Sequence, residues 1–192
     1  MEIYLIRHTK PKVGKGICYG QTDLEIDETS FEQELNFISK KLPNHIEKYF
    51  SSPLKRCRQL AEKLNADFST DKRLMELNFG NWENKNWNEI DQNQLNGWMQ
   101  DFVNISPPNG ENYKDLHLRT ESFINEVLKT NLQKIAIITH AGNIRSFLSF
   151  VLSSPLENSF RIHLDYATVV AVILNENKHF NKLVSIKNPK TI

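Results

Sequence analysis

The chain has 192 residues, enough for one domain with a buried core. Its 24 Lys and Arg residues nearly balance 23 Asp and Glu residues, which argues against a broad nucleic-acid-binding or membrane-binding surface. No stretch reaches the roughly 18 apolar residues of a membrane span, and the sequence enters a strand at once, without a secretory signal. Cys18 and Cys57 form neither a metal-binding spacing nor a disulfide framework. We therefore expect a single domain over residues 1–192, reduced and cytoplasmic.

The first predicted element is a short apolar strand at residues 2–6 that ends on Arg7 and His8. In an open α/β sheet, ligands bind at the carboxyl ends of the strands. A fixed cation beside an imidazole suits an anionic substrate, although such a pair taken alone is more often the start of a solvated loop. The loop at 9–26 that follows is long enough to suggest a functional role.

Helices and strands alternate over the next segments. A capping-box pattern of Ser30 and Gln33 predicts a helix that runs until Pro43. A strand at 46–50 is followed by Ser52 as a helix N-cap, with a proline in the first helical position. Arg56 then lies in the first helical turn, where the helix dipole favours an anion.

The region 73–112 is irregular, with a helix expected at about 87–102 and a turn at 107–110. We interpret residues 78–112 as an insertion, or lid, over the carboxyl edge of the sheet. A helix over 111–132 and a buried strand over 135–139 follow, and the strand delivers His140 to the start of another helix. Strands are also expected at 67–70, 168–174 and 183–186. This alternation predicts an α/β fold with a mostly parallel sheet.

If the sheet is parallel, Arg7, His8, Arg56 and His140 converge on one site. Guanidinium groups bind phosphate oxygens bidentately, and a neutral imidazole is a competent nucleophile toward phosphorus. A carboxyl group must supply the proton for the leaving oxygen. Glu76, placed between apolar residues, suits that task, and Glu83 close by is an alternative. Glu111 is a weaker candidate.

Six stretches now make the chain recognisable. They are residues 5–9 (LIRHT), 19–23 (YGQTD), 51–57 (SSPLKRC), Glu76 with 79–83 (FGNWE), 107–111 (PPNGE) and 139–145 (THAGNIR). Each is weak alone, but in this order they resemble the histidine phosphatase superfamily, the phosphoglycerate-mutase-like group, over essentially the whole chain. The resemblance implies a three-layer α/β/α sandwich.

The resemblance also implies roles for individual residues. His8 resembles the histidine that becomes phosphorylated, Arg7 and Arg56 the two phosphate-binding arginines, His140 the second histidine, and Glu76 the proton donor. It implies no metal and no cofactor, because the cationic site supplies the electrostatic stabilisation. Thr9 stands where many members have glycine, and with residues 16–23 it resembles the α-ribazole phosphatase branch of the cobalamin pathway. Asn109 and Asn112 depart from the family's usual glycine and serine, which affects the expected leaving-group contacts.

The expected substrate is a small phosphomonoester, and α-ribazole 5′-phosphate is favoured over sugar phosphates or nucleotides. A mutase, and a non-catalytic phosphoester-binding module on the same fold, are the alternatives. A homodimer is possible on the basis of exposed aromatic residues. The substrate-binding residues are expected to be Thr9, Tyr19, Gln21, Thr22, Trp82 and Gly142, whereas Arg119 and Arg145 are interpreted as structural or peripheral.

Overall fold

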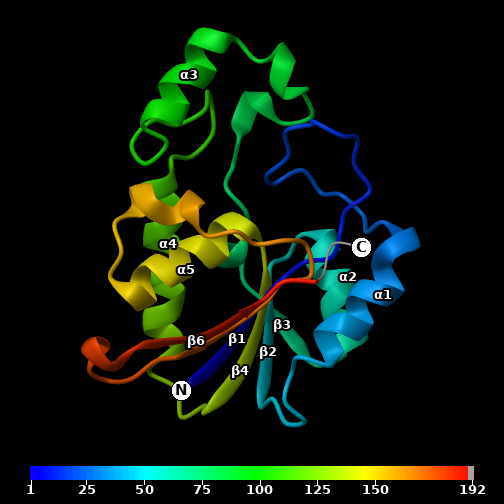
Figure 1. Ribbon diagram of the computed structural model, residues 1–192, viewed down its shortest axis with the longest axis vertical. Coiled ribbons are helices and arrows are strands. Elements are labelled where there is room, and N and C mark those ends of the chain that lie inside the picture. Colours follow the sequence, from blue (N-terminus) through cyan, green and yellow to red (C-terminus); the bar gives the residue numbers. More distant parts are fainter. Residues whose placement is uncertain (190–192) are drawn as a thin grey trace.

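A six-stranded sheet forms the centre of the computed structural model, which describes residues 1–189 (Figure 1). The strands are β1 (Glu2–Arg7), β2 (Lys48–Ser51), β3 (Phe68–Thr70), β4 (Lys134–Thr139), β5 (Val169–Ile173) and β6 (Lys182–Lys187). Their order is β3-β2-β4-β1-β5-β6. Strands β1 to β4 are parallel, and β5 is antiparallel to both of its neighbours. The predicted mostly parallel sheet is confirmed.

Helices cover both faces of this sheet. On one face lie α1 (Glu28–Ser39) and α2 (Lys55–Leu64), and on the other α4 (Tyr113–Val127) and α5 (Ala141–Leu152), as Figure 1 shows. The helix α3 (Gln92–Gln100) lies beyond one end of the sheet. Short 3-10 helices span Lys72–Leu74, Gly80–Trp82, Trp87–Glu89, Leu156–Arg161 and Lys178–Phe180. The three-layer α/β/α sandwich is therefore confirmed.

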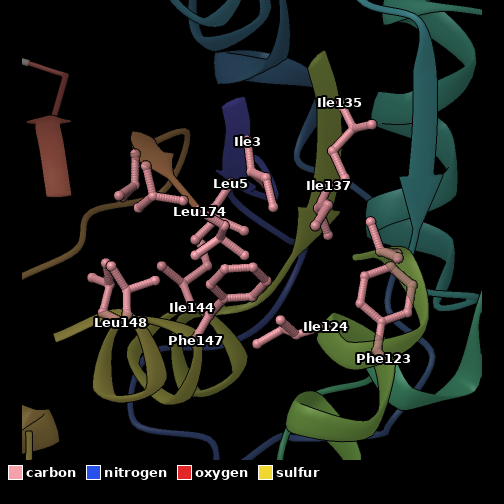
Figure 2. Packing of buried hydrophobic residues seen from close by; sticks show 14 of the residues in the cluster. Ile3, Leu5, Phe123, Ile124, Ile135, Ile137, Ile144, Phe147, Leu148 and Leu174 are labelled. Carbon is pink, nitrogen blue, oxygen red and sulfur yellow. The ribbon is translucent and has the colours of Figure 1, made fainter. Parts of the chain in front are cut away.

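The alternation of side chains along β4 explains why residues 135–138 in the middle of this strand are all apolar. Ile135 and Ile137 pack toward α4 and α5, together with Phe147 (Figure 2). The intervening residues Ala136 and Ile138 pack toward α1 and α2 on the opposite face. A parallel strand that is covered on both sides is apolar on both faces, and the one buried hydroxyl at its end, that of Thr139, donates to Leu74 O at 2.7 Å. Burial of each such isoleucine contributes about 1.5–3 kcal/mol.

Two predicted helix starts were wrong by two or three residues. The N-cap of α1 is Asp27, whose carboxylate accepts a hydrogen bond from the backbone N of Thr29 at 3.1 Å, so Ser30 lies inside the helix. The N-cap of α2 is Leu54, and Ser52 lies two residues before it. Arg56 remains in the first turn of α2, as expected.

Two predicted helices are shorter in the structure. The single helix expected at 87–102 is divided into a 3-10 turn and α3, because the side chain of Asp91 accepts the backbone N–H groups of Asn93 and Gln94 and starts a new helix. The helix expected at 111–132 begins after its N-cap Asn112 and ends at Val127. In residues 1–189 there is no helix long and apolar enough to cross a bilayer.

The segment 78–112 has a hydrophobic cluster of its own, centred on Trp82 and Trp98. Cys18 from the loop at 9–26 and Tyr113 from α4 complete this cluster. Backbone hydrogen bonds from Cys18 N to Lys85 O (2.8 Å) and from Asn84 N to Cys18 O (2.8 Å) join the two loops. The segment is thus fixed to the long first loop, and its role as a lid stays a prediction.

Candidate active site

Arg7 and His8 lie at the carboxyl end of β1. The backbone N of His8 donates to Thr139 O at 3.0 Å, at the end of the neighbouring strand β4. The His8 side chain is 2% exposed, and its Nδ1 lies 2.6 Å from the carbonyl oxygen of Thr9. Because a carbonyl oxygen only accepts hydrogen bonds, this contact assigns the proton to Nδ1. The lone pair on Nε2 is therefore free to react.

His140 lies next to His8, as the sequence predicts. It is the N-cap of α5, directly after β4, and its ring centroid is 5.0 Å from that of His8. Its Nε2 lies 2.8 Å from Ser52 Oγ and 3.4 Å from Cys57 Sγ. The hydroxyl that the sequence suggested as a helix cap thus also contacts this imidazole.

Both expected arginines are present at the same edge. Arg56 is fully buried and donates to the carbonyl oxygens of Thr22 (2.8 Å) and Gly20 (2.6 Å). Arg7 donates to Leu164 O at 2.6 Å. Within residues 1–189, the buried Nε atoms of both arginines find no hydrogen-bond partner. A buried donor without a partner costs about 1–3 kcal/mol, so the site has unused capacity for an anion.

Burial and these cations determine the charge of the histidines. Burial is the main cause that holds the pKa of His8 well below its ordinary 6.5, and the charges of Arg56 and Arg7 lower it further. The pKa of His140 is lowered well below 6.5 in the same way, first by burial and then by Arg56. Both imidazoles are therefore neutral at pH 7, and a neutral imidazole is the nucleophilic form.

Tyr166 is a site residue that the sequence analysis missed. Its ring centroid lies 4.0 Å from Arg7 Cζ and 5.7 Å from the His8 ring. Its hydroxyl is 2.6 Å from that of Tyr19, whose ring centroid lies 5.4 Å from Arg56 Cζ. Because β5 is antiparallel, the residues that precede it reach the same edge of the sheet as the carboxyl ends of β1 and β4. A strand direction of this kind leaves no local signal in the sequence.

Glu76 is tied to the first turn of α5, two residues after His140. Its Oε2 accepts a hydrogen bond from the backbone N of Gly142 at 3.1 Å, and its Oε1 accepts from the backbone N of Leu77 at 2.9 Å. A Cβ atom added to Gly142 would lie 2.2 Å from Glu76 Oε1. Glycine at this position therefore makes room for the carboxyl group beside the histidine.

The carboxylate of Glu83 has other hydrogen-bond partners than that of Glu76. Its Oε1 accepts from the backbone N of Gln21 at 2.8 Å and of Phe79 at 3.2 Å, and its Oε2 accepts from both the backbone N (2.5 Å) and the hydroxyl of Thr22. This carboxylate joins the loop at 9–26 to the segment 78–112. Four hydrogen bonds from two separate loops hold this carboxylate in place, and these contacts suit a structural role.

The expected substrate-binding residues fall into two groups. Five of them contact a predicted catalytic residue; for example, Gln21 Nε2 donates to the carbonyl oxygen of Glu76 at 3.0 Å. The others are Tyr19, Thr22, Thr9 and Gly142. Trp82 forms the second group. It is 3% exposed and packs against Trp98, with ring centroids 5.9 Å apart, in the core of the 78–112 segment. Its contact with a leaving group stays a prediction.

Arg145, on α5, donates from Nε to Ile162 O at 3.0 Å and places its guanidinium 5.2 Å from the Phe160 ring centroid. Burial lowers the pKa of Arg145.

In the part of the chain that the structure describes, no group of three His, Cys, Asp or Glu residues is arranged to hold a metal ion.

Two neutral imidazoles beside two guanidiniums, at the carboxyl edge of an α/β sheet, form an arrangement whose chemistry suits a phosphoryl group. The family model of the histidine phosphatase superfamily (branch 1) matches residues 3–188, and the chain belongs to this family of phosphatases.

Curated relatives cover nearly the whole chain. The chain is 27% identical to "Putative phosphoserine phosphatase 2" of Hydrogenobacter thermophilus, over 94% of this chain and 95% of the relative. It is 23% identical to the adenosylcobalamin/alpha-ribazole phosphatase of Escherichia coli, over 92% of this chain and 91% of the relative. Among solved structures, the alpha-ribazole phosphatase from Shigella flexneri aligns with a TM-score of 0.85 at 24% identity, over 95% of this chain and 94% of that one. This structural likeness concerns the fold.

Proposed function

We propose that the protein hydrolyses a phosphomonoester without a metal ion, through a covalent phosphoryl group on His8. The observation that carries this proposal is the state of His8. Its Nδ1 proton is held by Thr9 O at 2.6 Å, its pKa is lowered well below 6.5, and two guanidiniums flank it. Together these features leave Nε2 as a neutral nucleophile in a cationic environment.

In the first step, His8 Nε2 forms a bond to phosphorus while the bond from phosphorus to the leaving oxygen breaks. The carboxyl group of Glu76 gives its proton to that oxygen, and the alcohol departs. Arg7, Arg56 and His140 stabilise the negative charge of the phosphoryl oxygens during the transfer. The unused Nε–H groups of the two arginines supply donors for these oxygens.

In the second step, a water molecule attacks the phosphohistidine. The Glu76 carboxylate takes a proton from the water, the bond from phosphorus to Nε2 breaks, and inorganic phosphate leaves. The step regenerates neutral His8 and protonated Glu76, so one carboxyl group serves as acid and then as base.

For the substrate, we favour α-ribazole 5′-phosphate over other small phosphomonoesters. Thr9 and the 16–23 stretch resemble that branch, and two similar proteins carry the name α-ribazole phosphatase. The second candidate substrate is a small amino-acid phosphate, because another similar protein carries the name phosphoserine phosphatase. The 78–112 segment, bonded to the first loop, serves as a lid that favours a small molecule over a phosphoprotein.

The chemistry is tested by brief incubation with substrate followed by denaturation. We expect an acid-labile phosphoryl adduct on His8 that His8→Ala abolishes, and turnover that EDTA leaves unchanged. Retained turnover in His8→Ala would refute the covalent mechanism, and stoichiometric loss of turnover on chelation would refute the metal-free claim. Glu76→Gln is expected to slow alkyl phosphates much more than p-nitrophenyl phosphate, whereas Glu83→Gln is the matched control.

The substrate is tested by ranking kcat/KM for α-ribazole phosphate, phosphoserine, sugar phosphates and nucleotides. We expect α-ribazole phosphate to rank first. A higher rank for phosphoserine would assign the chain to the second candidate. Transfer of the phosphoryl group to a second alcohol in preference to water would identify a mutase, and binding of phosphate without turnover would identify a non-catalytic module.

A further inference from the structure

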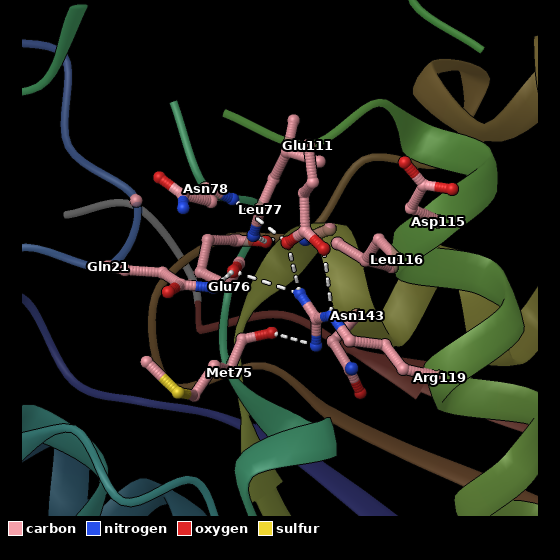
Figure 3. Close-up of polar contacts among 12 residues, drawn as sticks. Gln21, Met75, Glu76, Leu77, Asn78, Glu111, Asp115, Leu116, Arg119 and Asn143 are labelled. Atoms are coloured by element: carbon pink, nitrogen blue, oxygen red, sulfur yellow. Dashed lines mark hydrogen bonds and ion pairs between the residues drawn. The ribbon is translucent and has the colours of Figure 1, made fainter. Parts of the chain in front are cut away.

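One guanidinium, that of Arg119 on α4, holds the chain segment that carries Glu76 (Figure 3). Its Nη1 donates to the carbonyl oxygens of Arg73 at 2.7 Å and Met75 at 2.6 Å. Its Nη2 donates to the carbonyl oxygen of Glu76 itself at 3.0 Å. A side chain more than 40 positions away in sequence thus binds the backbone at and before the predicted proton donor.

The remaining N–H groups of Arg119 bind Glu111. Nε donates to Oε2 at 3.1 Å and Nη2 donates to Oε1 at 2.6 Å, and each side chain of this pair is 19% exposed. Glu111 Oε1 also accepts the backbone N–H of Asn78 at 3.0 Å, just beyond the Glu76 segment. The segment is therefore held on both sides of Glu76.

These contacts use all five N–H donors of the guanidinium. A lysine at position 119 has three donors on one nitrogen and lacks the planar fork, so it cannot reach three carbonyl oxygens and a carboxylate together. The geometry is specific to arginine.

The guanidinium contacts the backbone of Glu76, whereas the two carboxylate oxygens of Glu76 accept hydrogen bonds from Leu77 N and Gly142 N. A direct ion pair would favour the ionised carboxylate and oppose proton delivery. Pairing with Glu111 also compensates the charge of Arg119 close to the site. The cation therefore fixes the place of the acid without binding its carboxyl group.

We propose that Arg119, together with Glu111, is a positioning residue that sets the carboxyl group of Glu76 for proton transfer to the leaving oxygen. The proposal rests on the proposed function, and it assigns a task to two residues whose sequence pattern indicated only structural or weaker roles. Because Arg119 acts through Glu76, its loss must affect those substrates whose leaving group needs a proton.

The test compares Arg119→Lys with the unaltered protein on p-nitrophenyl phosphate and on a simple alkyl phosphate. A misplacement of about 1 Å costs roughly 100-fold in rate, so we expect kcat on the alkyl ester to fall about 30- to 100-fold. On p-nitrophenyl phosphate, whose leaving group departs without a proton, the fall should stay within about 3-fold. Glu111→Gln, which keeps the three carbonyl contacts, is expected to show a smaller change in the same direction.

Arg73→Lys is the matched control. Arg73 lies beside the same segment, but its guanidinium binds the carboxylates of Asp71 (2.6 Å) and Glu126 (2.8 Å). It should lower thermal stability without changing the ratio of the two rates.

Equal slowing of both substrates in Arg119→Lys would show a purely structural role and overturn the proposal, as would unchanged rates. If Arg119→Lys does not fold, an unchanged ratio of rates in Glu111→Gln overturns it. Failure of the proposed function is distinguishable, because the unaltered protein then forms no phosphohistidine and His8→Ala keeps its activity.

Discussion

Replacing Gly142 with alanine should separate catalysis from stability in this protein. The added Cβ would lie 2.2 Å from Glu76 Oε1, and ordinary van der Waals contact begins at 3.4 Å. The end of the glutamate side chain is the flexible partner, so it must retreat by about 1.2 Å. That retreat also breaks the hydrogen bond from Gly142 N to Glu76 Oε2.

Gly142→Ala is expected to change the reaction rate much more than the stability of the fold. A displacement of about 1 Å costs on the order of 100-fold in rate where the displaced group acts. In contrast, alanine is better than glycine within a helix by about 1 kcal/mol, and the lost hydrogen bond costs about 0.5–1.5 kcal/mol. The net change in the free energy of unfolding is near zero, which keeps the melting temperature within about 2–4 °C.

The assay measures kcat for an alkyl phosphate and for p-nitrophenyl phosphate, alongside thermal unfolding. Gly142→Ala should lose about 100-fold on the alkyl ester and little on the nitrophenyl ester. Gly97→Ala in α3 is the control, because an added Cβ there meets no heavy atom within 4 Å. It should raise the melting temperature slightly and change neither rate. Equal loss on both esters, or no loss at all, would refute the placement of Glu76 as the acid.

Two further predictions concern the buried cation and the histidines. Arg56→Lys cannot donate to the carbonyl oxygens of both Gly20 and Thr22, so it should weaken inhibition by inorganic phosphate about 10-fold or more and slow all substrates equally, as competition kinetics would show. His8 and His140 are neutral when folded, with pKa values held well below 6.5, but take up protons near that pH when unfolded. The unfolded chain binds more protons below pH 6.5, so the free energy of unfolding should fall on acidification by up to about 1.4 kcal/mol per pH unit for each histidine. Urea unfolding at several pH values measures this slope, which His8→Asn should reduce by the share of one histidine; a flat profile between pH 6.5 and 5.5 would contradict it.

The sequence predicted the site best where residues that can bind or react with phosphate directly follow an apolar strand pattern. An apolar run that ends on Arg7 and His8, and another that ends on His140, each mark a buried strand whose last residues leave the core. Parallel neighbouring strands then bring these ends together, since the register pairs Arg7 with Thr139. The family, the sheet and the placement of both histidines and Arg56 follow from such signals.

The sequence was less informative about the ends of helices. Ser30 and Asp27 are both capable N-caps, and the structure uses Asp27. Ser52 has the pattern of a cap, and its hydroxyl accepts a long hydrogen bond from Leu54 N at 3.4 Å. Tertiary packing also brings His140 Nε2 within 2.8 Å of the same hydroxyl. A local pattern shows which local hydrogen bonds a side chain can make, whereas the contacts with distant residues depend on the tertiary structure.

By itself, then, the sequence determined the order of strands and helices, the burial of both sheet faces and the identity of the residues that carry charge at the strand ends. Only the tertiary structure distinguished Glu76 from Glu83, since each lies in an irregular segment and their partners are distant backbone N–H groups. It also buried Trp82 and brought Tyr166 to the site through the reversed direction of β5. Periodicity and capping act over a few residues, whereas the two carboxylates are placed by contacts between segments 60 or more positions apart. Trp82 is placed by packing against Trp98 within its own irregular segment, which has no regular period to predict it.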